Sequence, residues 1–270
     1  MKEDFAARLR WWRERRALSQ LDLANEAEIS QRHLSFLELG RAAPSREMVL
    51  RLADALAVPF REQNTLLLAA GFAPVWREQR LDSPEASALH HALDLILAQQ
   101  EPYPGFVLDR RWHLLRTNRA GRQFVRFLTG DSTFEVDSQR PVNLAEALLA
   151  PDALRPLIGN WQDVALYFIR TVRGDALADR SDATAALLAR LLRYPDVAGF
   201  ARSAFMEQPQ DPVLTMAIRK GDVAMRLFTT LAVFGTPLEV TAEEVRIESF
   251  FPADEATAVL FRVWAEGVHS

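Results

Sequence analysis

The spacing of apolar residues in the first seventy positions predicts a series of short helices. In 4–16, the apolar residues Phe5, Leu9 and Trp12 recur at the steps that place side chains on one helix face. The same period, interrupted by polar and Gly/Pro stop signals, predicts four more helices: 20–27, 31–39, a stretch between Ser45 and Pro59, and 60–70. We therefore expect an all-α domain at residues 1–73.

Residues that start and stop helices mark the boundaries within this domain. Ser19 and Ser30 are typical N-caps, and Gly40 stands where a helix commonly ends in a left-handed residue. Residues 74–84 contain two prolines and mixed charges. This composition predicts a linker.

The pattern changes in residues 85–270, where helical periodicity gives way in places to strand-like alternation. Helices are predicted at 85–100, 119–128, 160–173 and 181–193, and strands at 106–108, 112–117, 213–219, 222–234 and 245–251. Asp109-Arg110-Arg111 and Lys220-Gly221-Asp222 are turn signals that join neighbouring strands into hairpins. Strands first and last with helices between them predict an α+β domain with an antiparallel sheet.

Composition narrows the class of protein. Hydrophobic residues make up 49% of the 270 positions and charged residues 25%, as in globular proteins. The absence of Cys excludes a disulfide framework, a thiolate zinc site and a Cys nucleophile. No stretch approaches the ~18 apolar residues of a membrane span, and the Arg-rich N-terminus lacks the apolar core of a signal peptide. We expect a cytoplasmic protein that does not bind membranes.

The formal net charge of −4 is unevenly distributed. Residues 1–80 carry 13 Lys or Arg and 11 Asp or Glu, whereas the remainder carries 19 and 25. A mildly basic N-terminal region allows a contact with nucleic acid there, although random scatter explains the difference almost as well.

Residues 18–45 carry the most informative motif. They place two short helices, each preceded by a Ser, on either side of a short turn, as a helix-turn-helix requires. The motif resembles that of the Xre/Cro family of regulators in features spread over the whole stretch: Leu18-Ser19-Gln20, Leu23-Ala24, Ile29-Ser30, Leu34-Ser35, Glu38, Gly40-Arg41 and Pro44-Ser45. The resemblance implies binding to double-stranded DNA.

The helix-turn-helix register assigns DNA contacts to particular residues. The positions near the start of the recognition helix are Ser30, Gln31, Arg32, Ser35 and Phe36. Gln suits adenine, Arg suits guanine, and an aromatic edge can meet a thymine methyl group. Gln20 is placed to reach a phosphate and to brace this helix, while Arg41 and Arg46 are placed to hold phosphates. For Arg32 taken alone, a solvated helix charge is the competing interpretation.

The family register also singles out three residues with structural roles. Arg13 and Glu38 are expected to form a partly buried ion pair between the first and third helices, the alternative being two separate surface charges. Glu28 stands in the turn where the family usually has Gly. A positive φ there would cost ~1 kcal/mol, unless the turn has a different shape.

Residues 85–270 contain no catalytic pattern. The glycines form neither GxGxxG nor GxxxxGK, and no Ser lies in a GxSxG turn. The adjacent His90 and His91 point roughly 100° apart on a helix, which favours ordinary helix positions over a metal site. We therefore expect no enzymatic activity, no metal and no resident cofactor.

Surplus apolar residues in this region point to a cavity. The predicted strand 222–234 is apolar on both faces, and Leu227, Thr229 and Leu231 form one of them. Phe124, on a predicted helix, adds an aromatic side chain. Ligand cavities are mostly apolar with a few polar groups, a role that suits Thr229. A filled core, with Thr229 as a simple strand former, is the equally weighted alternative.

The C-terminal region resembles the MmyB-like regulators. Similar segments lie at 66–74, 101–122, 154–165, 228–241 and 247–255. The resemblance implies a PAS-like ligand-binding domain at 85–270, with a fatty-acid-like apolar ligand. Asn160 and Trp161 lie in one of these segments and are expected to offer an amide and an indole donor, toward a carboxylate of the ligand. The alternative for Trp161 is a place in the core.

These features predict a homodimeric transcription regulator whose DNA affinity responds to a small apolar ligand. In the alternative, the C-terminal domain only dimerises and holds no ligand. An enzyme fused to a DNA-binding head is a third class. The sequence does not specify the operator, the ligand, the regulated genes or the direction of regulation.

Overall fold

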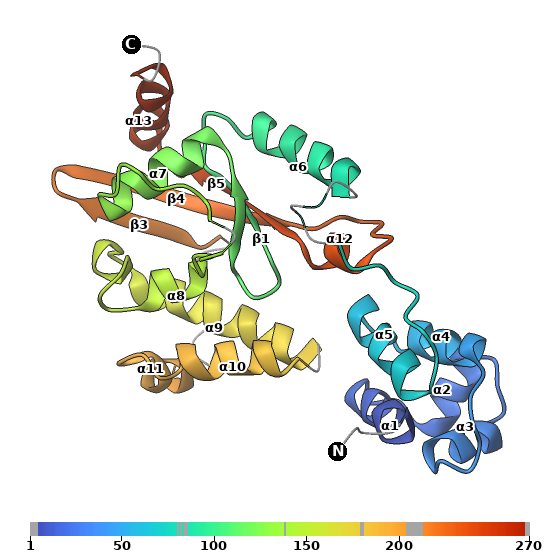
Figure 1. Cartoon of the computed structure of the whole chain (residues 1–270). Helices are drawn as coiled ribbons and strands as arrows, with labels where there is room; N and C mark the ends of the chain where they lie inside the picture. Colours follow the sequence, from blue (N-terminus) through green and yellow to red (C-terminus); the bar gives the residue numbers. More distant parts are fainter. Residues whose placement is uncertain are drawn as a thin grey trace. The chain divides into compact units, whose positions relative to one another are not determined.

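The computed structural model of the chain (Figure 1) describes residues 5–79, 81, 83, 86–137, 139–178, 181–203 and 213–267. The chain divides into two compact units. The first comprises Met1–Gln79 with Thr236–Glu243, and the second comprises Arg80–Gly235 with Glu244–Ser270. A segment late in the chain, 236–243, thus packs with the N-terminal helices, whereas the sequence pattern placed it with 85–270.

The first unit contains the five predicted helices, namely α1 (Phe5–Arg15), α2 (Gln20–Glu26), α3 (Gln31–Glu38), α4 (Arg46–Ala55) and α5 (Phe60–Ala69), together with α12 (Val240–Glu244), most of which belongs to it. Ser19, Ser30 and Ser45 each accept a hydrogen bond from a backbone N–H in the first turn of the following helix. These serines fix where α2, α3 and α4 begin. The helices bury one core, in which Trp12 and Leu34 are almost fully inaccessible.

Two left-handed residues set the turns on either side of α3. Glu28, between α2 and α3, has a φ of 53°, and Gly40, after α3, has a φ of 66°. At a positive φ, a Cβ atom lies too close to neighbouring backbone atoms. Gly has no Cβ atom, so Gly40 adopts this conformation without steric cost. Glu28 has a Cβ atom, so its conformation in the turn before α3 is strained.

The second unit is the predicted α+β domain, and its fold class is confirmed. Its helices are α6 (Ser87–Gln99), α7 (Arg119–Thr129), α8 (Leu144–Leu149), the 3-10 turn η2 (Arg155–Leu157), α9 (Trp161–Ala178), α10 (Asp182–Leu191), α11 (Val197–Ser203) and α13 (Glu255–Glu266). Its strands are β1 (Gly105–Leu108), β2 (Leu114–Thr117), β3 (Thr215–Lys220), β4 (Val223–Ala232) and β5 (Arg246–Pro252). No helix among the described residues of the chain is both long enough and apolar enough to cross a bilayer.

The five strands form one antiparallel sheet in the order β2-β1-β5-β4-β3. The two predicted hairpins, β1–β2 and β3–β4, are both present. Other segments cover the two edge strands: Ile158 bridges to Ile218 on β3, and His113, just before β2, bridges to Asn143. Covered edges protect a sheet from pairing with other chains.

Helices cover both faces of the sheet (Figure 1). On one face, α8, α9 and α10 pack over Met216, Leu227 and Phe250 in the larger core of this unit. On the other face, Leu93 and Leu97 of α6 pack against Val107 and Ile247. Since neighbouring residues of a strand alternate between faces, Phe250 and Ile247 belong to different layers.

Four helices were not predicted from the sequence: α8, α11, α12 and α13. The first three have five to seven residues, which is too short for a 3.6-residue period to be recognised. The sequence predicted that strands would dominate from residue 213 onward, and this is wrong for α13. The Asp254 side chain caps α13 by accepting a hydrogen bond from the Thr257 N–H at 2.8 Å.

Candidate functional site

The helix-turn-helix consists of α2, the turn through Glu28, and α3. Ser19 and Asp22 form a capping box at the start of α2, in which each side chain bonds the other's backbone N–H. The Ser30 hydroxyl accepts from His33 N at 3.2 Å and caps α3. Ser30, predicted as a DNA contact, thus also orients the first turn of the recognition helix.

The predicted DNA-contacting residues of α3 lie on its outer side. Gln31 and Arg32 are exposed, and Ser35 and Phe36 are half-buried, whereas Leu34 and Leu37 are buried in the core. The guanidinium carbon of Arg32 lies 5.4 Å from the centre of the Phe36 ring. The attraction between the cation and the ring face stabilises this position of the Arg32 side chain.

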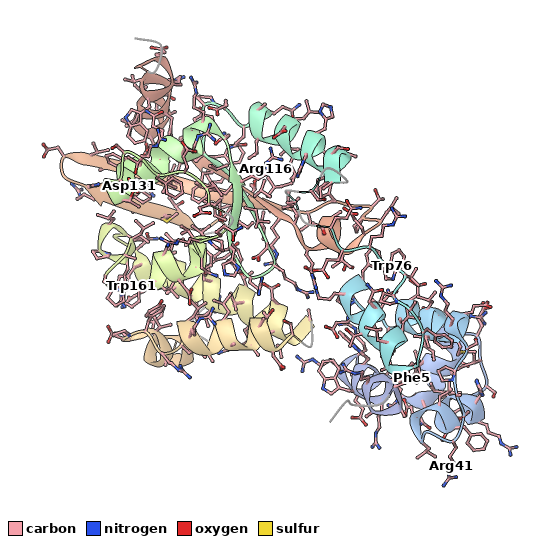
Figure 2. All side chains as sticks on the ribbon, viewed as in Figure 1. Phe5, Arg41, Trp76, Arg116, Asp131 and Trp161 are labelled. Carbon is pink, nitrogen blue, oxygen red and sulfur yellow. The ribbon has the colours of Figure 1, made fainter. Side chains whose placement is uncertain are left out.

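Arg41 and Arg46 follow α3 in the chain, Arg41 in the loop after it and Arg46 at the start of α4. Both residues are exposed, and Figure 2 shows the side chain of Arg41 projecting outward. Neither guanidinium makes a hydrogen bond or ion pair within the part of the chain that the structure describes. Both cations are therefore available to a phosphate.

A buried ion pair joins α1 to α3. Arg13 donates to Glu38 through two parallel bonds, Nε to Oε1 at 2.6 Å and Nη2 to Oε2 at 2.9 Å. Arg13 also donates to the Leu18 carbonyl at 2.9 Å. The side chains are 12% and 3% exposed, respectively, so the pair is largely shielded from water. The hydrogen bond to Glu38 is the main cause that raises the pKa of Arg13.

Gln20 belongs to the same network. Its amide nitrogen donates to Glu38 Oε2 at 2.8 Å. Gln20, predicted to reach a phosphate and to brace the recognition helix, thus contacts α3 through Glu38, where its amide nitrogen is engaged.

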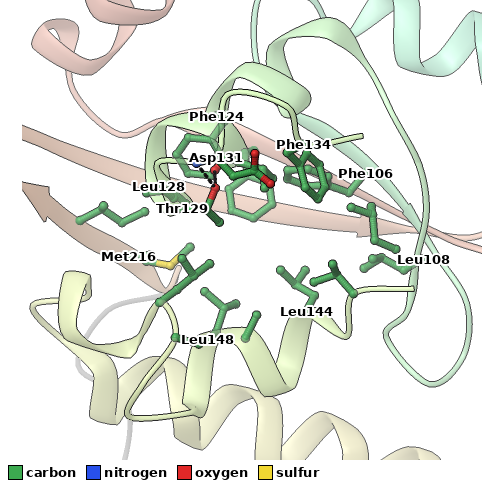
Figure 3. A pocket seen from close by; sticks show the side chains of 18 of the residues that line it. Phe106, Leu108, Phe124, Leu128, Thr129, Asp131, Phe134, Leu144, Leu148 and Met216 are labelled. Atoms are coloured by element: carbon green, nitrogen blue, oxygen red, sulfur yellow. Dashed lines mark hydrogen bonds between the residues drawn. The ribbon is translucent and has the colours of Figure 1, made fainter. Parts of the chain in front are cut away.

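The second unit contains an apolar cavity of about 360 Å³ (Figure 3). It lies between the sheet and the helices α7 and α8. Its wall includes Phe106 and Leu108 of β1, Phe124 and Leu128 of α7, Leu144 and Leu148 of α8, Met216 and Ile218 of β3, Phe250 of β5, and Phe134. This volume lies within the roughly 300–1,000 Å³ of small-molecule sites.

The polar side chains in the cavity wall are Thr129, Asp131 and Asp152. The Thr129 hydroxyl donates to the Val125 carbonyl at 2.8 Å and accepts from Asp131 N at 3.2 Å. Hydrogen bonding from Thr133 is the main cause that lowers the pKa of Asp131, which holds this carboxyl in its charged form. Apart from this small polar group, contacts with a ligand would be apolar.

Of the six residues predicted to contact a ligand, the structure places Phe124 in the wall. Leu227, Thr229 and Leu231 lie on the cavity-facing side of the sheet, as the register of β4 with Phe250 shows, but beyond the wall. Leu227 is fully buried in the core and Leu231 is 38% exposed. The Thr229 hydroxyl hydrogen-bonds the buried carboxyl of Glu248 instead.

Asn160 and Trp161 also lie outside the cavity wall. The Asn160 side chain clamps the edge strand β3, because its Nδ2 donates to Thr215 O at 2.7 Å and its Oδ1 accepts from Ala217 N at 2.9 Å. Trp161 begins α9, and the Arg155 guanidinium lies 3.6 Å from the centre of its ring. The Asn160 amide therefore fastens β3, and neither residue belongs to the cavity wall.

The residues of α8 and of the loop after α7 were missed by sequence reasoning. Phe134, Leu144 and Leu148 are apolar, but they stand in a stretch with a weak periodic signal. Only their proximity to Phe106 and Phe250 across the cavity identifies them as part of a site.

Comparison with known proteins assigns both units to families. A model described as the MmyB-like transcription regulator ligand binding domain matches residues 89–263. A model described as a helix-turn-helix domain matches residues 4–66. No curated protein matches the chain.

Proposed function

This chain belongs to the MmyB-like transcription regulators, and we propose that a small apolar molecule, such as a fatty acid, occupies its cavity and thereby controls its binding to DNA. The DNA-binding unit is the helix-turn-helix domain, and the ligand-binding unit is the α+β domain. The observation that carries the proposal is the apolar cavity of about 360 Å³ inside the α+β domain.

The composition of the cavity wall supports an apolar ligand. Phenylalanine, leucine, valine, methionine and isoleucine side chains from the sheet, α7 and α8 form most of it. Burial of an alkyl chain contributes about 0.8 kcal/mol per methylene group. An acyl chain in this space therefore gains most of its affinity from the chain itself.

The wall offers little to the head group of such a ligand. Its charged members among the described residues are the carboxylates Asp131 and Asp152, and the Thr129 hydroxyl is already bonded to a carbonyl. We therefore expect an acid to bind no more tightly than an alcohol of the same chain length, because these carboxylates oppose a second negative charge. Selection by chain length and shape follows from this.

Control of DNA binding requires a ligand that favours one of two states of the protein. A regulator that binds DNA as a homodimer places two recognition helices on an operator with two-fold symmetry. Occupancy of the PAS-like domain would change how well both helices engage their half-sites at once, and hence the affinity. In this proposal, α3 reads bases through Gln31 and Arg32, and Arg41 and Arg46 hold phosphates.

Native mass spectrometry of the freshly purified full chain tests this proposal. We expect a dimer with additional small-molecule mass, which organic extraction then identifies. Ala147→Phe, which fills the cavity from α8, should remove the added mass, whereas Ala88→Phe on the exposed side of α6 should not. A dimer with no added mass in every preparation would instead favour a C-terminal domain that only dimerises.

A further inference from the structure

The segment 236–243 belongs to the first unit, but the strands before and after it in the sequence belong to the second unit. It connects β4 to β5, two adjacent strands of the sheet in the second unit. Yet it packs within the first unit, together with α5 and with residues 75–79 that follow α5. The strand β5 begins at Arg246, only a few residues after this segment, and reaches the cavity wall at Phe250.

Side chains and backbone of α12 are bonded to the residues that follow α5. The Thr241 hydroxyl accepts from Gln79 N at 3.0 Å and donates to Gln79 O at 2.6 Å, so it satisfies both backbone groups of that residue. Val240 N donates to Arg77 O at 2.9 Å, and its side chain is fully buried. These bonds hold α12 firmly against 77–79.

Glu243 caps helix α5 from a distant part of the sequence. Its Oε2 accepts from the Phe60 backbone N–H at 2.8 Å. The local N-cap residue of α5 is Pro59, whose side chain makes no capping bond. A carboxylate at a helix N-terminus satisfies a free N–H and interacts favourably with the helix dipole.

Residues 75–79 are themselves fastened to α5. Asn64 Oδ1 accepts from the N–H groups of Val75 and Trp76, at 2.9 and 3.0 Å, and its Nδ2 donates to Trp76 O. The Trp76 ring stacks on Phe60 with the ring centres 3.9 Å apart. Residues 75–79 of the predicted linker 74–84 are therefore packed against α5. Both α12 and residues 75–79 contact the first turn of α5.

We propose that α12 transmits the state of the cavity to the DNA-binding unit, with Thr241 and Glu243 as the residues that couple β4 and β5 to α5. This inference rests on the proposed ligand control. Filling of the cavity displaces Phe250 and β5, and α12 passes this change to the first turn of α5. The buried residues Leu66 and Leu67 of α5 then carry it into the core shared with α2 and α3.

Amide hydrogen exchange of the full chain, measured by mass spectrometry, tests the coupling. The cavity is filled in two ways: with dodecanoate, and by the substitution Ala147→Phe, which needs no ligand. If Ala147→Phe does not fold, Leu144→Phe takes its place. In the wild type we expect filling to change exchange in 124–134, beside the cavity, and also in 60–66 and 75–79.

The double variant Thr241→Val/Glu243→Ala should uncouple the two regions, because it removes the hydroxyl bonded to Gln79 and the oxygen that accepts from Phe60 N. Exchange in the first turn of α5 should be roughly fivefold faster, which corresponds to the loss of one helix cap. Filling should still change exchange in 124–134 but no longer in 60–66. Thr236→Val/Glu239→Ala makes the same chemical changes in the same segment, away from these bonds, and should behave as wild type.

Two results would overturn the coupling. One is a response in 124–134 without any in 60–66 of the wild type, and the other is a response in 60–66 that survives the double variant. A lack of response to dodecanoate alone counts against that ligand class, since Ala147→Phe still decides whether α12 couples the units.

Discussion

The guanidinium of Arg13 and the carboxylate of Glu38 form a two-bond ion pair at 2.6 and 2.9 Å, almost out of contact with water. Removal of either partner leaves a buried charge without compensation. We expect Arg13→Met or Glu38→Gln to lower the free energy of unfolding by about 2–4 kcal/mol, and the double variant to lose less than the sum. Chemical denaturation of the four proteins gives the coupling energy.

The pair between Glu47 and Arg51 on α4 is a matched control. These side chains are 81% and 41% exposed, so Arg51→Met and Glu47→Gln should leave the free energy of unfolding close to that of the wild type. Strict additivity of Arg13→Met and Glu38→Gln would show that the two residues act as independent surface charges.

Substitutions in α3 should change the DNA sequence preference, whereas substitutions in the loop after α3 should change the affinity for all DNA sequences. Gln31→Ala should relax the preference at particular operator positions, because each bidentate base contact contributes ~1–3 kcal/mol of discrimination. Arg41→Ala should weaken all sequences similarly and reduce the salt dependence of binding. Selection on a randomised DNA library, followed by titration at several salt concentrations, measures both. A uniform loss from both substitutions would mean that α3 does not read bases.

Glu28 and Gly40 have nearly the same backbone conformation but different residues. Glu28→Gly should stabilise the protein by about 0.5–1 kcal/mol, because Gly relieves the strain at a φ of 53°. Gly40→Ala should destabilise it by about 1 kcal/mol. An added Cβ at Gly40 meets no atom within 4 Å, so its cost comes from the backbone alone. Thermal unfolding tests both, and a loss of stability in Glu28→Gly would contradict the strain.

Features set by neighbouring residues were predictable from the sequence. The five N-terminal helices follow from local caps such as Ser30, and both hairpins follow from their turns. The family register placed Arg13 opposite Glu38, which no local pattern reveals. The prediction of a helix-turn-helix regulator with an MmyB-like ligand-binding domain is confirmed.

Features that depend on distant segments were not predictable. Asn160 has the chemistry of a ligand contact, but its partners on β3 lie more than fifty residues later. The cavity wall at Leu144 and Leu148 comes from a helix too short to show a period. The placement of 236–243 beside α5 and residues 75–79 has no sequence signal, because 236–243 resembles an ordinary loop and 74–84 an ordinary linker.

Asn160 should matter for stability and not for ligand recognition. Asn160→Ala removes the donor to Thr215 O and the acceptor for Ala217 N on the edge strand β3. We expect a loss of about 2 kcal/mol in the free energy of unfolding, while Gln162→Ala, on the exposed surface of α9, should change it by less than about 0.5 kcal/mol. If Asn160→Ala instead abolished ligand uptake at unchanged stability, Asn160 would be a ligand contact after all.

Glu248 should make the stability of the protein depend on pH near neutrality. Its carboxyl is fully buried on β5, and burial raises its pKa from 4.5 to about 7, despite an opposing hydrogen bond from Thr229. Between these pH values the folded chain keeps a proton that the unfolded chain releases, so stability falls as the pH rises through this window. The accumulated loss above pH 7 is about 3 kcal/mol.

Glu248→Gln keeps the size of the side chain and cannot ionise, so the variant should unfold at a higher temperature than wild type above pH 7, with the difference vanishing near pH 4. The control Glu47→Gln, at an 81% exposed side chain, should follow the wild-type curve. Thermal unfolding between pH 4 and 9 measures all three proteins, and equal pH profiles for Glu248→Gln and wild type would show that Glu248 ionises with little cost in the folded chain.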